Sequence, residues 1–103
     1  MGSLNIAAVA AGYDHVVALN IDGTVWAWGN NSVGELGIGT AINSSVPVRV
    51  SGLAGVQGIA AGYRNSFAET SSNTIFAWGN NSDGQLGDLT TTNRWSPVAI
   101  TLP

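Results

Sequence analysis

The hexapeptide AWGNNS at residues 27–32 recurs at residues 77–82, fifty positions further along the chain. The similarity extends in both directions at the same offset, without insertion or deletion, from residues 9 and 59 to residues 48 and 98. Self-similarity at such a period is typical of solenoids, propellers and arrays, in which one unit cannot bury its apolar surfaces alone. We therefore predict that the chain consists of two copies of one structural unit.

The repeat register also predicts the boundaries of the two units. Residues 1–3 resemble a start codon followed by a cloning scar, which leaves a first repeat at residues 4–53 and a second at residues 54–103. Because this span equals two whole periods and its end is in phase with its start, we favour an engineered or excised fragment. Four glycines, one leucine and one tryptophan define each copy: Gly12, Trp28, Gly29, Gly34, Leu36 and Gly37, then Gly62, Trp78, Gly79, Gly84, Leu86 and Gly87.

Composition excludes several classes of partner. The chain has 103 residues, of which 45% are hydrophobic and only 9% charged, with a formal net charge of −3. Its few arginines are scattered and it has no lysine, whereas nucleic-acid binding needs clustered basic residues. No apolar run approaches the roughly 20 residues of a membrane-spanning helix. The absence of cysteine excludes disulfides and thiolate metal sites, and it leaves the cellular compartment open.

Each unit contains short segments that favour strands over helices. In the first copy, residues 6–11 are small and apolar, residues 15–19 are apolar on both faces, and residues 24–28 alternate. The Asp-Gly pair at residues 22–23 favours a hairpin, and residues 43–50 form a fourth, outer strand whose proline suits a sheet edge. The predicted fold class is therefore all-β, with two four-stranded antiparallel sheets.

These motifs resemble a known family. The pattern combines AAGY at residues 10–13, GTVWAWGNN at residues 23–31, GELG at residues 34–37 and PV at residues 47–48. It is similar to the repeats of the regulator of chromosome condensation family of β-propellers, and the resemblance covers nearly all of residues 4–103. It implies one four-stranded blade per repeat, in rings of roughly seven blades. Because members range from a nucleotide exchange factor to a β-lactamase inhibitor and a plant ultraviolet photoreceptor, it implies a fold and not a task.

The four tryptophans could form a stacking platform for sugars or bases. We instead interpret Trp28 and Trp78 as filling space between neighbouring blades, a common role of aromatic side chains. Trp95 stands opposite Ser45 in the repeat register and is less tied to the architecture of the blade. Trp95 is therefore our candidate ligand contact.

No catalytic, metal or cofactor site is predicted. The Asp14-His15 pair has Arg64 and Asn65 at the equivalent positions, so we interpret His15 as a polar residue that opens a strand and donates to a backbone carbonyl. One histidine without cysteine does not make a typical zinc site. Residues 81–84 are weakly similar to a calcium loop, but its first and twelfth ligand positions would hold glycine and threonine.

Two blades alone would expose an unpaired strand edge and two apolar sheet faces. We therefore predict a homo-oligomer in which chains associate head to tail and close a β-propeller. Three chains would give six blades and four would give eight, and we favour four; the outer strand could come from the neighbouring chain. The predicted function is a non-catalytic, self-assembling scaffold for protein interaction. The alternative is a ligand-binding module, with a lectin-like or protein-inhibitor surface built from the Asn- and Ser-rich loops.

Overall fold

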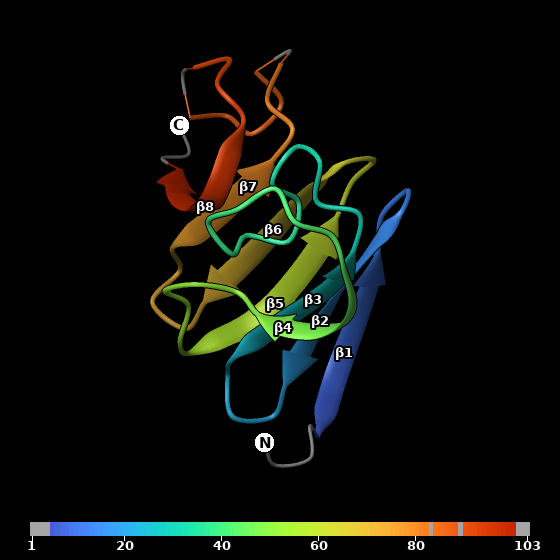
Figure 1. Cartoon of the computed structure of the whole chain (residues 1–103). Helices are drawn as coiled ribbons and strands as arrows, with labels where there is room; N and C mark the ends of the chain where they lie inside the picture. The colour runs from blue at the N-terminus through green and yellow to red at the C-terminus, as the bar shows by residue number, and fades with distance from the viewer. Residues whose placement is uncertain (1–4, 83, 89, 101–103) are drawn as a thin grey trace.

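The structure, a computed structural model, describes residues 5–82, 84–88 and 90–100, which form eight strands in two sheets (Figure 1). Blade 1 has the strand order β1-β2-β3-β4 and blade 2 the order β5-β6-β7-β8, with every neighbouring pair antiparallel. The predicted fold class, all-β with two four-stranded antiparallel sheets, is confirmed. The strands of blade 1 are Ile6–Ala11, His15–Asn20, Val25–Gly29 and Ser44–Arg49, and those of blade 2 are Val56–Ala61, Asn65–Thr70, Ile75–Gly79 and Arg94–Ile100.

The turn between the second and third strand of each blade needs a residue with positive φ. Gly23 has φ +85° in blade 1, and the equivalent Asn73 has φ +66° in blade 2. Asparagine tolerates this left-handed region better than other residues with a Cβ atom, which explains why it can replace the glycine. The two hairpins therefore keep the same geometry with different residues.

A second backbone requirement explains the glycine that follows Trp28 and Trp78. Gly29 has φ +114°, and a Cβ atom there would lie 2.6 Å from the backbone oxygen of Asp14. Gly79 has φ +104°, with the oxygen of Arg64 at the same distance. The tryptophan thus places a large ring on the face of the sheet, and the glycine permits the sharp backbone turn that ends the strand.

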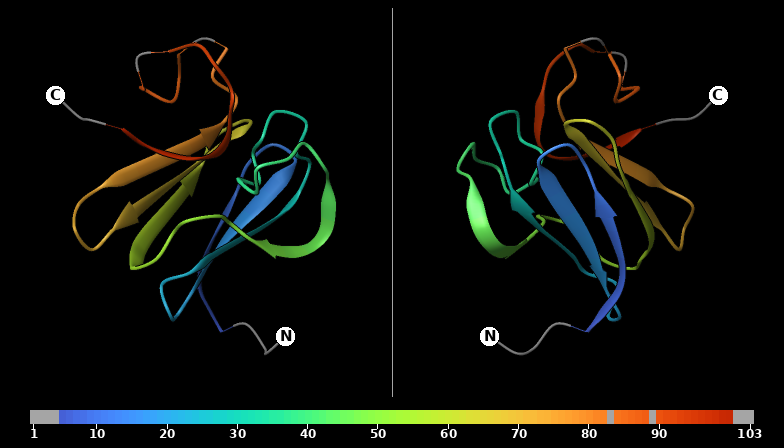
Figure 2. Two further views of the ribbon diagram at one scale, coloured as in Figure 1. Left: turned by 60° about the vertical axis from the view of Figure 1, so that its left-hand side comes forward. Right: turned by 90° about the vertical axis from the view of Figure 1, so that its right-hand side faces the viewer.

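The two sheets pack face to face, as neighbouring layers joined by the segment between β4 and β5 (Figure 2). Strand β5 contacts both β1 and β2, so the second blade begins against the face of the first. The buried core between the blades is formed by Val17, Leu19, Val25, Ala27, Leu36, Val50, Leu53, Val56, Ala68 and Trp78. This core draws on both blades, so the apolar side chains of one blade are buried by the next.

Each blade supplies its own outer strand. Strand β4 pairs with β3 through Trp26 and Arg49 and through Ala27 and Val48, and β8 pairs with β7 in the same manner. Exchange of the outer strand between chains is therefore not needed to complete either sheet. Among the described residues, no helix is long and apolar enough to cross a membrane.

Candidate functional site

The junction between the blades shows how one repeat recognises the next. Trp78 lies on the face of blade 2 that meets blade 1, and its side chain is fully buried. Its indole Nε1 donates a hydrogen bond of 2.9 Å to the backbone oxygen of Glu35, in the loop that follows β3. A Cβ atom on Gly37 would lie 2.8 Å from Trp78 Nε1, so this glycine lets the loop close over the ring.

A polar seam accompanies this apolar contact. The hydroxyl of Ser66 donates to the same Glu35 oxygen at 3.0 Å and lies 2.9 Å from His15 Nε2. The backbone N–H of Tyr13 also donates to the oxygen of Tyr63 at 2.9 Å. These hydrogen bonds are directional, so they fix the position of one sheet relative to the other, which apolar contact alone would not do.

Blade 1 presents the counterparts of these junction residues on its outward face. We call this surface open face 1. Val9 is 60% exposed, whereas Ile59, its equivalent in blade 2, packs against the core between the blades. Trp28 is partly exposed, whereas Trp78 is fully buried. The strand register places Val16 opposite Trp28, and Ala18 opposite both Trp26 and Val9. Open face 1 therefore consists of Ile6, Val9, Val16, Trp26 and Trp28.

Blade 2 has a hollow of about 280 Å³ on its own outward face, lined by Gly58, Ala60, Phe67, Glu69 and Ile75. Ile59 and Ala68 also border this hollow, although both pack in the core between the blades. We call this surface open face 2. Its Phe67 and Ile75 are equivalent to Val17 and Val25 of blade 1, which blade 2 buries completely. Glu69 takes the place of Leu19, which is a buried core residue in blade 1. Open face 1 and open face 2 thus correspond to the two surfaces that meet at the internal junction.

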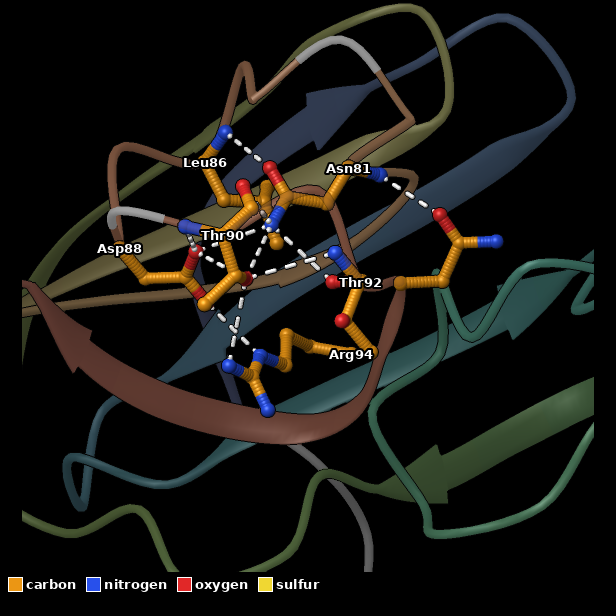
Figure 3. Close-up of polar contacts among 7 residues, drawn as sticks. Asn81, Leu86, Asp88, Thr90, Thr92 and Arg94 are labelled. Carbon is orange, nitrogen blue, oxygen red and sulfur yellow. Dashed lines mark hydrogen bonds and ion pairs between the residues drawn. The ribbon is translucent and has the colours of Figure 1, made fainter.

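The loops after β3 and β7 are each held by a buried asparagine, shown for blade 2 in Figure 3. The Asn81 side-chain oxygen accepts from the N–H of Leu86 at 2.9 Å, and its Nδ2 donates to the backbone oxygens of Thr90 and Thr92 at 3.1 and 3.0 Å. Asn31 makes the equivalent bonds in blade 1, to Leu36 and to the oxygens of residues 40 and 42. Sequence reasoning missed this role, although both asparagines lie in the repeated hexapeptide.

Only the loop of blade 2 contains the ion pair between Asp88 and Arg94, among the residues that the structure describes. The Arg94 Nε atom lies 2.7 Å from Asp88 Oδ2. The hydroxyl of Thr90, which donates to Asp88, holds the pKa of this carboxyl well below its usual range, and Arg94 adds to the effect. Blade 1 has Ile38 and Ser44 at the two positions of the pair, so its loop lacks this interaction.

His15 lies at the start of β2, where the sequence placed it, and its side-chain partner is the Ser66 hydroxyl of the other blade. Burial lowers the pKa of His15, and Asp14 partly opposes this effect. Burial raises the pKa of Glu35, whose side chain lies near those of Asp14 and His15. Sequence reasoning missed the proximity of Glu35, which comes from a loop twenty positions away.

The Ser66 hydroxyl beside His15 invites comparison with a catalytic serine. Its side chain is completely buried at the junction, and it already donates to the backbone oxygen of Glu35. A nucleophile must be reached by its substrate, and this hydroxyl is covered by both blades. The described part of the chain therefore shows no catalytic element.

The candidate ligand contact Trp95 lies on β8 and is 39% exposed. Its backbone oxygen accepts a 2.8 Å hydrogen bond from Gly39 N, and a Cβ atom on Gly34 would lie 2.9 Å from its Cα atom. Trp95 therefore sits where β8 meets the loop of blade 1. It does not line the hollow of open face 2.

The sequence model of the regulator of chromosome condensation (RCC1) repeat matches residues 22–68 and 72–103, and a second RCC1 repeat model matches residues 6–35 and 56–85. The chain belongs to the RCC1 repeat family. The resemblance stated from the sequence is thereby confirmed. Together these matches include both blades, so each blade is an RCC1 repeat.

Solved structures share this fold. Prp20p of Saccharomyces cerevisiae is 31% identical over the whole chain with a TM-score of 0.86, and human WBSCR16 is 29% identical over 95% of the chain with a TM-score of 0.84. The ultraviolet-B receptor UVR8 of Arabidopsis thaliana is 35% identical over 54 residues, which cover 52% of this chain and 12% of the receptor. The chain spans 25% of Prp20p and 27% of WBSCR16, and so corresponds to a small part of each relative.

Proposed function

We propose that this RCC1-repeat chain is a non-catalytic, self-assembling scaffold for protein interaction. In the proposed assembly, open face 2 of one copy packs on open face 1 of the next, and the copies close a β-propeller. The observation that carries the proposal is that the internal junction occurs once within the chain while both of its halves recur, uncovered, at the two ends. Apolar faces of this kind are normally covered in soluble proteins.

The internal junction supplies the template for contact between copies. Trp28 takes the place that Trp78 has within the chain. Val9 and Trp26 take the places of Ile59 and Phe76, which pack against the core between the blades. These two side chains then fill the hollow of open face 2. The contact is heterologous, because two different surfaces meet, and a heterologous contact forms a ring when its rotation closes.

The number of chains follows from the number of blades. Each copy contributes two blades, so three copies give six blades and four copies give eight. We favour four copies. A seven-bladed ring is not a whole number of two-blade copies, so one blade of the fourth copy would remain outside it.

The wider role in protein interaction is supported by the partners of related proteins. Prp20p of Saccharomyces cerevisiae binds Gsp1p and histones, and another solved structure holds yeast RCC1 bound to Kap60. These partners are known for the yeast protein and are not assigned to the present chain. For the present chain we propose that the ring offers its loops to a protein partner, without contact to nucleic acid or membrane.

A complementation experiment tests the head-to-tail arrangement. Val9→Glu blocks open face 1 and Ala60→Glu blocks open face 2, and both parent residues are exposed or partly exposed, so each variant should still fold. Each variant alone should be a monomer, while an equal mixture should contain a dimer joined by the two unblocked faces. Native mass spectrometry separates these species. Ser32→Glu, at an exposed loop position, is the control and should assemble like the parent chain.

Either of two results would overturn the arrangement. If both blocked variants assemble like the parent chain, the open faces are not the contact. If the mixture remains monomeric while circular dichroism shows that both variants are folded, the two faces do not bind one another.

The second candidate, a ligand-binding module, is favoured by one observation. The rings of Tyr13 and Tyr63 are more than 60% exposed and lie 4.4 Å apart between centroids, with the Arg64 guanidinium 5.7 and 5.4 Å from them. Tyrosine and arginine are enriched among residues that dominate binding to proteins. Saturable binding that is lost in Tyr63→Ala or Trp95→Ala, with the mass of the assembly unchanged, would support this module. Binding that survives both changes would exclude it.

A further inference from the structure

A cluster of three side chains, of which two are buried and one is partly buried, lies at the junction of the blades and takes no part in the proposed assembly. Asp14 precedes β2, His15 opens this strand, and Glu35 lies in the loop after β3. One ligand atom from each side chain lies within 4.8 Å of those from the other two. His15 is 2% exposed and Glu35 is completely buried.

All three side chains carry a buried polar atom without a hydrogen-bond partner among the described residues. These atoms are Asp14 Oδ1, His15 Nδ1 and Glu35 Oε2. Leaving such atoms unsatisfied is unfavourable, and structures usually provide a partner for them. Because the cluster brings carboxylate oxygens together with a ring nitrogen, a single cation would satisfy all three.

The hydrogen bonds around His15 decide which ring nitrogen has a free lone pair. The Ser66 hydroxyl donates its proton to the backbone oxygen of Glu35, so toward His15 Nε2 it can only accept. Nε2 therefore carries the hydrogen and Nδ1 carries the lone pair. Histidine ligands of metals commonly donate their other N–H in this way, which orients the ring.

We propose that Asp14, His15 and Glu35 bind a divalent transition-metal cation such as Zn²⁺. Two carboxylates and one imidazole form a mixed oxygen and nitrogen donor set that suits such ions. Tetrahedral zinc with bonds of about 2.0–2.2 Å places its ligand atoms about 3.4 Å apart. Since the ligand atoms lie within 4.8 Å of one another, they must approach by up to about 1.4 Å. A water molecule completes the coordination at the fourth position.

Charge and position are consistent with this site. Arg64 also acts electrostatically on Glu35, and its single positive charge leaves one net negative charge on the two carboxylates. Because Ser66 belongs to blade 2, bound cation holds His15 against the neighbouring blade. A ligand that binds only this arrangement stabilises the folded pair of blades.

Blade 2 provides the matched comparison. At the three equivalent positions it has Arg64, Asn65 and Gln85, none of which is an anionic or imidazole ligand. Among the described residues, the site therefore occurs once. The replacements His15→Asn and Glu35→Gln introduce residues that the same fold already carries in its other repeat.

Calorimetric titration of the untagged, chelator-treated chain with ZnCl₂ tests the proposal. We expect one ion per chain, a higher melting temperature with zinc, and affinity at least about tenfold weaker in each of His15→Asn and Glu35→Gln. Asp22→Asn removes an exposed carboxylate outside the cluster and should bind like the parent chain. Absence of binding at millimolar zinc, or binding that both variants leave unchanged, would overturn the site.

Anomalous scattering at the zinc edge, from crystals of the parent chain grown with the ion, tests the site without any substitution. A peak between His15 Nδ1 and Glu35 Oε2 supports the proposal. A peak elsewhere, or none, contradicts it.

Discussion

Trp28 and Trp78 occupy the same position in the two repeats, yet their surroundings differ. Trp78 is fully buried and donates to the Glu35 oxygen of the neighbouring blade. Trp28 stands on the outward face of blade 1 and is partly exposed. The difference shows that a blade does not bury its own tryptophan and that the neighbouring structural unit does so.

The largest effect is expected when each tryptophan is replaced by alanine. Trp78→Ala removes a buried ring and its hydrogen bond, so it should lower the free energy of unfolding by about 3–5 kcal/mol. Trp28→Ala should leave the individual chain folded and weaken the association of copies. Urea denaturation at several protein concentrations separates the two effects, because only association makes the midpoint depend on concentration. Equal loss of chain stability in both variants would break the comparison.

A smaller loss is expected when the buried asparagines of the two loops are replaced. Asn81→Ala leaves the N–H of Leu86 and the oxygens of Thr90 and Thr92 without this partner, which should cost about 1–3 kcal/mol of stability. Asn31→Ala should behave alike in blade 1. Asn81→Asp keeps the acceptor for Leu86, removes the donor to the carbonyls and places a second carboxylate beside Asp88 Oδ1, to which Asn81 Nδ2 donates at 2.9 Å, so its loss of stability should be at least as large. Stability equal to that of the parent chain in Asn81→Asp would show that the donor contributes nothing.

Glu69→Leu restores on open face 2 the residue that blade 1 has at position 19. If open face 2 is buried between copies, removal of this carboxylate should strengthen association by about tenfold, equivalent to about 1.4 kcal/mol. Sedimentation equilibrium of the parent chain and the variant measures the change. An unchanged dissociation constant would show that Glu69 lies outside the contact.

The smallest effect concerns the ion pair that only the loop of blade 2 contains, within the described part of the chain. Since the folded chain holds the pKa of Asp88 below its ordinary value, the pair stabilises the protein fully above that value, and this contribution is lost as the pH falls below it. Asp88→Asn should therefore show a smaller decrease in stability between about pH 5 and pH 3. Urea midpoints at the two pH values provide the measurement. An identical decrease in both proteins would show that other carboxyls account for the acid sensitivity.

The repeat register made the strands predictable to within one or two residues. The predicted segments at 6–11 and 15–19 correspond to β1 and to nearly all of β2, because glycine and turn residues limit each apolar run. The outer strand predicted at residues 43–50 is observed as Ser44–Arg49. Propensity and alternation are local properties, and each strand displays them in its own sequence.

The contacts around the loops could not be predicted in this way. Asn81 bonds to backbone oxygens nine and eleven positions away, and these meet only because the loop turns back over the asparagine. Glu35 approaches His15 from another element, with no spacing that indicates it. Such contacts depend on the path of an irregular loop, and the periodicity of the sequence does not predict that path.

The mass of the chain in solution, measured by native mass spectrometry, tests the central claim most directly. A single species of three or four chains, four being our prediction, would agree with closure of a ring through the two open faces. A folded species with the mass of one chain, at every protein concentration measured, would contradict the assembly and leave the RCC1 repeat assignment untouched.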